Sequence, residues 1–548
     1  MTLAPRSAKD LHQQAFPSRR SAVLGDRGMV ATSQPLAAQA GLRTLHAGGN
    51  AIDAAVTAAA ALAVVEPTGC GLGGDCFALV YHAATGKVSA FDGSGRSPLA
   101  QTRDVITASG QDTMPQRGAL SVTVPGAVDA WQRLLDAFGR CSMADVLAPA
   151  IRLAEDGYPV SELIASAWRR SEALLGQHPP ATTHWLPGGR APRAGERFHA
   201  PAYARCLRTI AEGGAGAFYR GAIAEDLAST CQAAGGYLDV ADLAAHRGRW
   251  VDPIHTDFLG ARIWQCPPPG QGLATLLAMG FAQRGPAELG APSFGSFEHL
   301  HGLIEAVRLA FADAEAHIAD PEHHPAPLAD LLAPDYLAAR GAAIDAERCR
   351  PSPTAGIPGR GGTVYVSTVD EEGNGCSLIF SNYMGFGSGL VGATTGIPLQ
   401  NRGAGFTLAW DHPNGYAPGK RPFHTIIPGL ATRADNGSLL AVFGVMGGHM
   451  QPQGQLQVML DICAYDMDPQ RALDAPRFQV TPQGRLALEP WFGDDVRQRL
   501  AAAGHDLLSR ETTPGAGSFG GGQIIALTPE NVRVGGSDPR KDGLVATQ

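Results

Sequence analysis

The sequence predicts a large, loop-rich α/β enzyme, and its composition supports this class. The chain has 548 residues, several times the length of an average single domain, and 44% of them are hydrophobic, which is enough for a large packed core. Charged residues make up only 17%, whereas glycine (69 residues) and proline (40 residues) are abundant. This balance is typical of a folded protein with many turns and not of a disordered chain.

Charge and hydropathy exclude two classes of partner. The 43 basic and 51 acidic side chains give a net charge of −8, so there is no basic excess to neutralise the phosphates of a nucleic acid. The most apolar stretch, residues 54–65, is too short and too rich in alanine to cross a membrane. We therefore expect a soluble protein without nucleic-acid or membrane partners.

The sequence also lacks the usual patterns of a cofactor site or an export signal. The nine cysteines show no C-x-x-C spacing and the histidines no metal-ligand spacing, so neither a metal nor another cofactor is expected. Residues 1–28 carry basic side chains without the apolar block of a secretion signal, which favours a cytoplasmic location. We expect these residues to be a disordered leader and the fold to begin near Met29.

The first part of the chain predicts helices followed by a hairpin. An extended segment from Met29 leads into an alanine-rich helical region, which breaks at Gly48-Gly49-Asn50 and then resumes. Two strand-like runs, residues 77–81 and a second that ends at Phe91, flank a turn at Thr85-Gly86 and predict a β-hairpin. The region from Val128 to about residue 340 is predicted to be mostly helical.

A change in composition near residue 350 marks the clearest boundary. Residues 350–362 are rich in proline and glycine and lack a helical period, so they predict a flexible linker. From Thr363 onward, alternating residues 364–369, a turn and a returning run at 376–380 predict a second hairpin. A further apolar strand, residues 439–446, ends at Gly447-Gly448.

Gly69, Gly71 and Gly74 match the pattern G-x-G-x-x-G, but their context does not favour nucleotide binding. The dinucleotide fingerprint follows a strand and opens a helix, whereas here a helix precedes the glycines and a strand follows them. We expect a turn that needs glycine because its φ is positive.

Thr363 is a candidate nucleophile only if the chain is cut in front of it. A threonine that begins a strand is usually structural. If the Gly362–Thr363 bond is broken, however, Thr363 gains an α-amine with a pKa of roughly 7.7–8.0, which can act as the base for its own hydroxyl. Gly447 and Gly448 fit either a simple turn or an oxyanion hole, in which one backbone N–H contributes about 3–4 kcal/mol.

Dispersed motifs, in a fixed order from Met29 to Gly543, relate the chain to a known family. They are Gly48-Gly49-Asn50-Ala51-Ile52-Asp53, Val65-Glu66-Pro67, Gly71-Leu72-Gly73-Gly74, Val124-Pro125-Gly126, Pro267-Pro268-Pro269, Glu305-Ala306-Val307-Arg308, Asp320-Pro321, Phe386-Gly387-Ser388-Gly389, Asp474-Ala475-Pro476-Arg477-Phe478 and Gly536-Ser537-Asp538-Pro539-Arg540. With these motifs the chain resembles the γ-glutamyltransferase family of N-terminal-nucleophile (Ntn) hydrolases.

The resemblance implies an α+β fold, the four-layer αββα sandwich of Ntn hydrolases, formed by a zymogen that cleaves itself. The cut would fall between Gly362 and Thr363. Residues 29–362 would form the large-subunit region and residues 363–548 the small-subunit region of one intertwined domain. The two fragments are expected to associate, and their further assembly into a dimer of heterodimers stays open.

The resemblance also implies the roles of the catalytic residues. Thr363 would attack first its own upstream carbonyl and then the amide of a substrate. Gly447 and Gly448 would stabilise the oxyanion. Ser381 stands where the family has a threonine that hydrogen-bonds the nucleophile, and this change keeps the hydroxyl group.

The positions that hold the glutamyl α-carboxylate in glutathione-using members differ in this chain. The family arginine after the first hairpin is replaced by Ser94, although Arg96 lies two residues further on. The family's Ser-Ser pair is replaced by His424-Thr425.

The positions that hold the α-amino group differ as well. They contain Tyr383, Arg402 and Gly405, so a cation stands where an ammonium should be received and the acidic partner is missing. A buried ammonium without an acidic partner is costly. Arg402, Arg96 and His424 would instead suit a small carboxylate that carries an amide and no α-amine. A structural salt bridge is the alternative role for Arg402.

The motifs around Tyr383, Asn401-Arg402 and Lys420-Arg421 look like the branch of the family that contains oxamate amidohydrolase. We therefore expect an amidohydrolase that cleaves a small amide such as oxamate and releases ammonia or an amine. Two alternatives stay open. One is a γ-glutamyl transferase or glutathione hydrolase, and the other is an unprocessed, non-catalytic paralogue.

Overall fold

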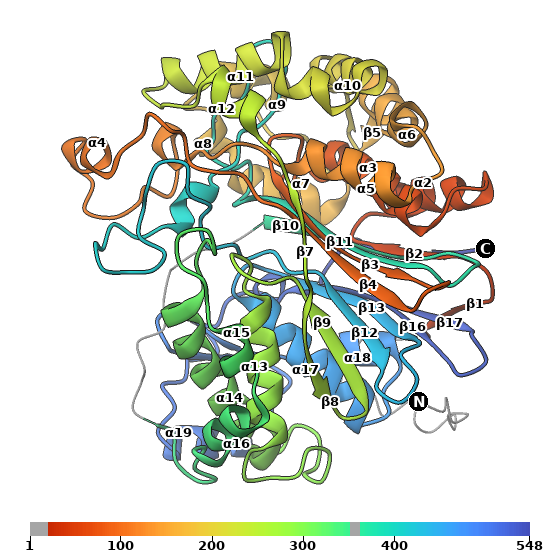
Figure 1. Cartoon of the computed structure of the whole chain (residues 1–548), viewed down its shortest axis with the longest axis vertical. Coiled ribbons are helices and arrows are strands. Elements are labelled where there is room, and N and C mark those ends of the chain that lie inside the picture. Colours follow the sequence, from red (N-terminus) through yellow and green to blue (C-terminus); the bar gives the residue numbers. More distant parts are fainter. Residues whose placement is uncertain (1–19, 351–361) are drawn as a thin grey trace.

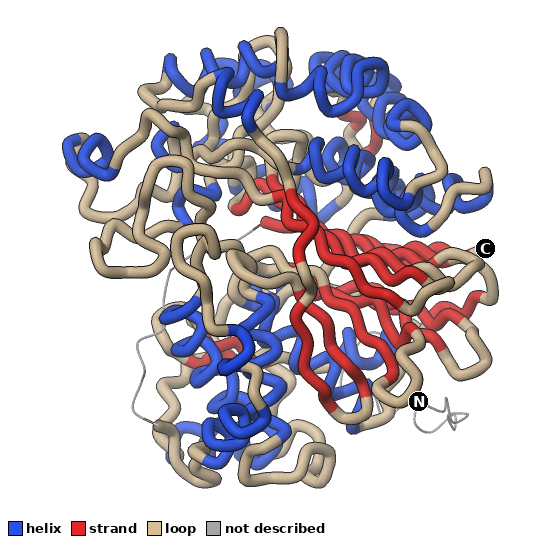
Figure 2. The backbone as a smooth tube through the Cα atoms, viewed as in Figure 1, coloured by secondary structure: helices blue, strands red, loops and turns tan. Residues whose placement is uncertain are grey.

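The computed structural model describes residues 20–350 and 362–548. Two antiparallel β-sheets lie face to face in the middle of the molecule, and helices cover the outer face of each (Figure 1, Figure 2). The predicted four-layer αββα arrangement is therefore confirmed. The predicted linker at 351–361 lies outside the described residues.

Each sheet has seven strands and combines strands from both sides of the Gly362–Thr363 bond. The first sheet has the order β18 (Leu544–Thr547), β2 (Met29–Thr32), β10 (Gly362–Val369), β11 (Gly375–Tyr383), β3 (Asp75–His82), β4 (Lys87–Gly93) and β7 (Arg249–Val251). The second has the order β1 (Val23–Gly25), β17 (Arg533–Ser537), β16 (Gly521–Leu527), β13 (Leu439–Met446), β12 (Gly429–Arg433), β9 (Ala261–Gln265) and β8 (Ile254–Phe258). The two hairpins predicted from alternation are β3–β4 and β10–β11.

The alanine-rich region forms two helices against the outer face of the first sheet, α2 (Pro35–His46) and α3 (Ala51–Val65). The chain breaks between them because Asn50 caps α3: its side chain accepts hydrogen bonds from the N–H groups of Ile52 and Asp53, and the Asp53 carboxylate accepts one from Asn50 N–H. The same layer contains α5 (Ala127–Phe138), α6 (Met143–Asp156), α7 (Glu162–Arg170), α8 (Glu172–Leu175), α9 (Pro179–Trp185), α10 (Pro201–Tyr219), α11 (Ala222–Ala233) and α12 (Val240–Ala245).

A second group of helices packs on the outer face of the second sheet. It consists of α13 (Gly272–Gln283), α14 (Phe297–His317), α15 (Leu328–Leu331), α16 (Pro334–Ala342), α17 (Met450–Ala464), α18 (Pro469–Asp474) and α19 (Asp494–Ala502), together with the small hairpin β14 (Phe478–Val480) and β15 (Leu486–Leu488). Helix α4 (Arg103–Ala108) stands apart, where Ile106 packs with Phe406 and Tyr416. In the described residues, every helix is too short or too polar to span a lipid bilayer.

Apolar side chains between the two sheets hold β10 against β13. The Tyr365 ring lies against Gly444, where a Cβ would stand 2.6 Å from a ring carbon, and Ser367 Oγ lies 3.2 Å from Val442 O. Residue numbers rise along β10 as they fall along β13, so extending this series by one step leads from Thr363 towards Met446 at the end of β13. The packing of the sheets therefore brings the start of β10 to the end of β13.

The expected start of the fold at Met29 is wrong. Strand β1 (Val23–Gly25) pairs with β17 and forms an edge of the second sheet. Strand pairing, rather than a local hydrophobic pattern, places these three residues. The first 19 residues lie outside the described part of the chain.

We expect Gly444→Ala to destabilise the protein, because the added methyl group would overlap the Tyr365 ring. Overpacking of this kind typically costs about 1–3 kcal/mol, which would lower the melting temperature of a chain of this length by about 1–3 °C. Gly216→Ala is the control, because no atom lies within 4 Å of the added Cβ. Equal melting temperatures for the two variants, measured by calorimetry, would contradict the close contact.

Candidate active site

Thr363 is the second residue of β10 and is only 3% exposed. Its Oγ1 donates a hydrogen bond to Ser381 Oγ at 3.4 Å, and Ser381 Oγ also accepts one from Tyr383 N–H at 2.7 Å. The β10–β11 pairing is irregular between Gly362 and Val364, so the strand is locally distorted at Thr363. The structure thus brings Thr363 and Ser381 together, as the sequence analysis expected.

Gly447 and Gly448 form the turn between β13 and α17, with φ values of 124° and 61° that L-residues rarely adopt. Gly448 O accepts a hydrogen bond from Gln271 Nε2 at 2.9 Å, and the same amide donates to Thr425 O at 2.6 Å. Within the described residues, neither glycine N–H has a hydrogen-bond acceptor. The turn therefore offers two N–H groups at the end of β13, the strand end towards which the packing of the sheets directs Thr363.

Arg402 is fully buried, and its guanidinium is incompletely paired. Nη1 donates to Thr425 Oγ1 at 2.8 Å, and the guanidinium carbon lies 4.3 Å above the centre of the Tyr383 ring. Its Nε and Nη2 have no hydrogen-bond partner in the described chain. Burial lowers the pKa of Arg402 to about 10, so the group stays cationic at neutral pH.

Tyr383 is a strained residue at this position. Its φ of 76° lies in the left-handed region, which typically costs a non-glycine residue about 1–3 kcal/mol. Such strain often accompanies functional sites. Here the unusual backbone ends β11 and places the ring under the Arg402 guanidinium.

His424 pairs with a buried carboxylate that the sequence analysis missed. Its Nε2 lies 2.8 Å from Asp75 Oδ2, while Asp75 Oδ1 accepts hydrogen bonds from Gly95 N–H and Gln400 Nε2. Burial raises the pKa of Asp75 to about 7 and lowers the pKa of His424 well below its usual value, so the imidazole is neutral. His424 Nδ1 has no partner among the described residues.

Arg96 is the predicted site residue that the structure does not bring to this group. Its guanidinium donates to both oxygens of Glu322 at 2.7 Å and to Gly419 O at 2.7 Å. The position that aligns with the family arginine, Ser94, donates to Asp92 instead. Arg96 therefore already has ionic partners, whereas two guanidinium nitrogens of Arg402 are unpaired.

The glycine run before Asp75 serves close packing. Added Cβ atoms at Gly73 and Gly74 would lie 2.1 Å from Pro398 O and 2.4 Å from Ser381 O. None of the glycines from Gly69 to Gly74 has a positive φ, so the expectation of a positive-φ turn is wrong. The glycines allow the loop to lie close against the end of β11. The position of Asp75 directly after this glycine run is the sequence feature that could have identified Asp75 as a site residue.

Two further buried polar residues were also missed. Asn382, between Ser381 and Tyr383, is fully buried, and neither atom of its amide group has a partner in the described chain. Gln271 connects the Gly448 turn to Thr425. Neither residue stands in a short recognisable motif.

One set of side chains away from Thr363 has metal-binding character. Ligand atoms of Glu305, Cys349 and His505 lie within 4.8 Å of one another. The Arg308 guanidinium contacts both Glu305 and Cys349 and supplies the positive charge there. We therefore assign no metal to this cluster.

Comparison with known proteins decides the family. The model of the gamma-glutamyltranspeptidase family matches residues 37–548. The chain belongs to the gamma-glutamyltranspeptidase family. It shares the Ntn-hydrolase fold, and its relatives in this family are hydrolases and acylases.

Three similar proteins illustrate the range of relatives. The crystal structure of cephalosporin acylase from Bacillus halodurans matches with a TM-score of 0.90 and 42% identity, covering 100% of this chain and 99% of that one. "Glutathione hydrolase-like YwrD proenzyme" of Bacillus subtilis is 38% identical, over 95% of this chain and 98% of that protein. "Oxamate amidohydrolase proenzyme" of Klebsiella pneumoniae is 37% identical, over 96% and 99%. The names establish a hydrolase family with proenzymes and leave the substrate open.

We expect Asp75→Asn to change how stability depends on pH. A carboxyl group whose pKa is raised in the folded state contributes most to the free energy of unfolding below its unfolded pKa of about 3.9. This contribution is lost as the pH rises towards about 7. Asparagine does not ionise, so the melting temperature of the variant relative to the parent should rise between pH 4.5 and 7.5.

The control for this prediction is Asp257→Asn, because Arg262 lowers the pKa of Asp257 and the group is ionised over the whole range. Its melting-temperature difference from the parent should change little. A constant difference for Asp75→Asn as well would show that Asp75 has an ordinary pKa.

Proposed function

We propose that this protein is a self-processing amidohydrolase that cleaves the amide of a small, carboxylate-bearing, oxamate-like acyl group. The observation that carries the proposal is Arg402, a buried cation with two unpaired guanidinium nitrogens, Nε and Nη2. A buried arginine with free N–H groups needs an anionic partner, and a carboxylate can accept two parallel hydrogen bonds from it. A substrate carboxylate would supply that partner.

The residues around Arg402 support an acyl group without an α-amine. His424 is neutral, Thr425 offers a hydroxyl, and Asp75 already accepts hydrogen bonds from Gly95 and Gln400 and pairs with His424. None of the positions that receive an ammonium in glutathione-using members contains an acid here. A short α-oxo amide such as oxamate carries a carboxylate and no ammonium, so it matches these charges.

The chemistry would begin with cleavage of the chain. Thr363 Oγ would attack the carbonyl of Gly362, the acyl group would move from nitrogen to oxygen, and water would hydrolyse the ester, leaving Thr363 with a free α-amine. Its hydroxyl, held by Ser381, would then attack the substrate carbonyl while the α-amine takes the proton. Gly447 and Gly448 N–H would stabilise the oxyanion.

The second half of the cycle completes the hydrolysis. The C–N bond of the substrate breaks as the leaving amine takes a proton from the Thr363 ammonium. The resulting ester on Thr363 is then hydrolysed by water, which supplies a hydroxyl to the acyl group and a proton to the threonine oxygen. The products are the acid and ammonia or an amine.

Glutathione hydrolysis is the second candidate, because several relatives carry that name, including a "Glutathione hydrolase proenzyme" of Escherichia coli that is 29% identical. It would require the γ-glutamyl ammonium to lie beside Arg402. Turnover of a γ-glutamyl anilide, with transfer to glycylglycine, and no ammonia from oxamate would favour this candidate.

We expect Thr363→Ala to remain a single 57.0 kDa chain without activity, because it lacks the hydroxyl needed for both steps. The parent protein should give two bands on a denaturing gel, and the smaller should begin Thr-Val-Tyr-Val on N-terminal sequencing. Thr363→Ser keeps a hydroxyl and should restore cleavage. An uncut parent protein that hydrolyses amides would contradict this mechanism. Its activity would also exclude the alternative of a non-catalytic paralogue.

We expect Arg402→Lys to raise KM for oxamate by about tenfold or more, because lysine lacks the planar pair of donors and a charged hydrogen bond is worth about 1.5–3 kcal/mol. Ammonia release at a series of oxamate concentrations measures kcat and KM. Arg96→Lys is the matched control, because Arg96 is paired with Glu322. A larger effect at Arg96 than at Arg402 would place the carboxylate elsewhere.

A further inference from the structure

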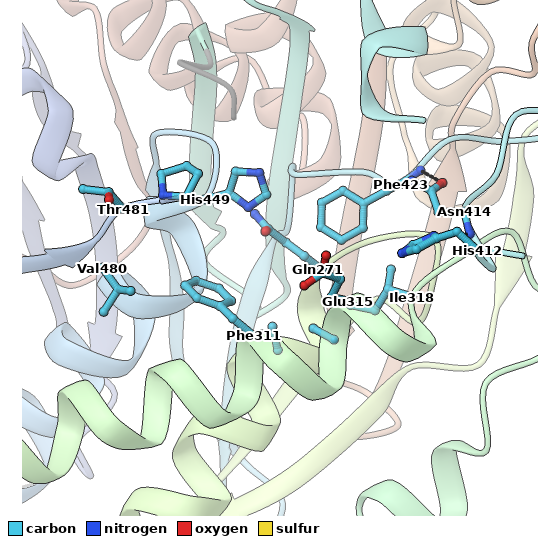
Figure 3. A pocket seen from close by; sticks show the side chains of 13 residues that line it. Gln271, Phe311, Glu315, Ile318, His412, Asn414, Phe423, His449, Val480 and Thr481 are labelled. Carbon is cyan, nitrogen blue, oxygen red and sulfur yellow. Dashed lines mark hydrogen bonds between the residues drawn. The ribbon is translucent and has the colours of Figure 1, made fainter. Parts of the chain in front are cut away.

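An apolar pocket lies beside the Gly447–Gly448 turn. Its lining comprises Gln271, Ala274, Phe311, Ala314, Glu315, Ile318, His412, Asn414, Phe423, His449, Val480, Thr481 and Pro482. Figure 3 shows Phe311 rising from helix α14, and the rings of His449 and Phe423 lying above this helix with Gln271 beside them. Most of the lining is apolar, and Glu315 and His412 add charged or titratable groups.

The three rings have a defined arrangement. Phe423 stacks on His449 with ring centres 5.8 Å apart and an angle of 19°, and Phe311 stands nearly perpendicular to His449 at 6.5 Å and 89°. Asn414 fixes the segment that carries Phe423: its Oδ1 accepts from Phe423 N–H, and its Nδ2 donates to Gly405 O. An aromatic group entering the pocket would therefore meet ring faces and edges, the contacts that aromatic pairs prefer.

Gln271 connects the pocket to the candidate active site, and the pocket is separate from the carboxylate position. Gln271 lines the pocket and donates to both Gly448 O and Thr425 O. His449 directly follows Gly448, and Phe423 directly precedes His424. Arg402 and Tyr383 do not line the pocket.

A substrate amide has two arms at its carbonyl carbon, the acyl group and the amine. With the carbonyl oxygen at the Gly447–Gly448 turn and the acyl carboxylate at Arg402, the amine arm is left to occupy the pocket on the His449 side. Ammonia, the leaving group of oxamate itself, would leave this apolar surface unused. An aromatic ring on the amine would cover this apolar surface and remove it from contact with water.

We propose that the pocket lined by Phe311, Phe423 and His449 is the leaving-amine subsite and selects amides of aromatic amines over primary amides. This inference rests on the proposed function, since it takes the acyl arm to be the carboxylate held by Arg402. In the reaction, the C–N bond to the aromatic amine breaks, the amine nitrogen takes the proton held by the Thr363 α-ammonium, and the acyl group remains on Thr363 Oγ until water releases it.

The test compares oxamate with N-phenyloxamate, which differ only in the ring on the amide nitrogen. In the parent protein, kcat/KM for N-phenyloxamate should exceed that for oxamate by about tenfold or more, the scale on which apolar pockets discriminate. Phe311→Ala should reduce this ratio by a similar factor. Phe294→Ala is the control: Phe294 is also partly buried and packs on His299 and Tyr465, outside the pocket, so the ratio should be unchanged.

A binding measurement makes the test independent of the chemical step. Aniline should inhibit oxamate hydrolysis in the parent and in Phe294→Ala, and about tenfold more weakly in Phe311→Ala. Thr481→Trp, which fills the pocket from its edge, should weaken aniline inhibition as well. Hydrolysis of both substrates at a ratio that Phe311→Ala does not alter would overturn the subsite. Hydrolysis of neither substrate would overturn the proposed function itself.

Discussion

Thr363 and the Gly447–Gly448 turn are far apart in the sequence, and the packing of β10 against β13 ties their positions together. The contact depends on Gly444, which has no side chain and so lets the Tyr365 ring lie against the facing strand. The two facing contacts, Tyr365 with Gly444 and Ser367 with Val442, align the strands so that the start of β10 is directed towards the end of β13. The candidate nucleophile and the candidate oxyanion donors therefore have their relative position fixed by the core and not by a flexible loop.

A second constraint is electrostatic. The interior around Arg402 holds a cation, a neutral imidazole and a carboxyl whose pKa is near neutrality, and burial weakens the charged form of each. The protein supplies one hydrogen bond and one aromatic face to the guanidinium and leaves two of its donors unpaired. An arginine whose donors were all paired within the protein would stabilise the fold more, but it would have no donor left to bind a ligand. The strained backbone of Tyr383 likewise costs stability in exchange for the arrangement of the site, because this conformation places the Tyr383 ring under the Arg402 guanidinium.

The sequence predicted the parts of this structure that depend on local patterns. The helix break before Ala51, both hairpins and the strand that ends at Met446 follow from capping, alternation and glycine pairs. Strand β1 was missed because three residues carry too little pattern, and pairing with β17 makes them a strand. Arg96 and Arg402 looked equally available in the sequence, but Glu322, distant in the chain, pairs with one and not with the other. Long-range partners of this kind are outside the reach of spacing arguments.

Each sheet alternates between segments that precede and follow the Gly362–Thr363 bond: β10 and β11 stand between β2 and β3, and β12 pairs with β9. A break in that bond would leave two polypeptides joined by whole ladders of backbone hydrogen bonds and by the shared interior. Separating the two polypeptides would require both sheets to unfold. Neither piece contains a complete sheet on its own, so if the bond is cut, the chain would have to fold before it is divided.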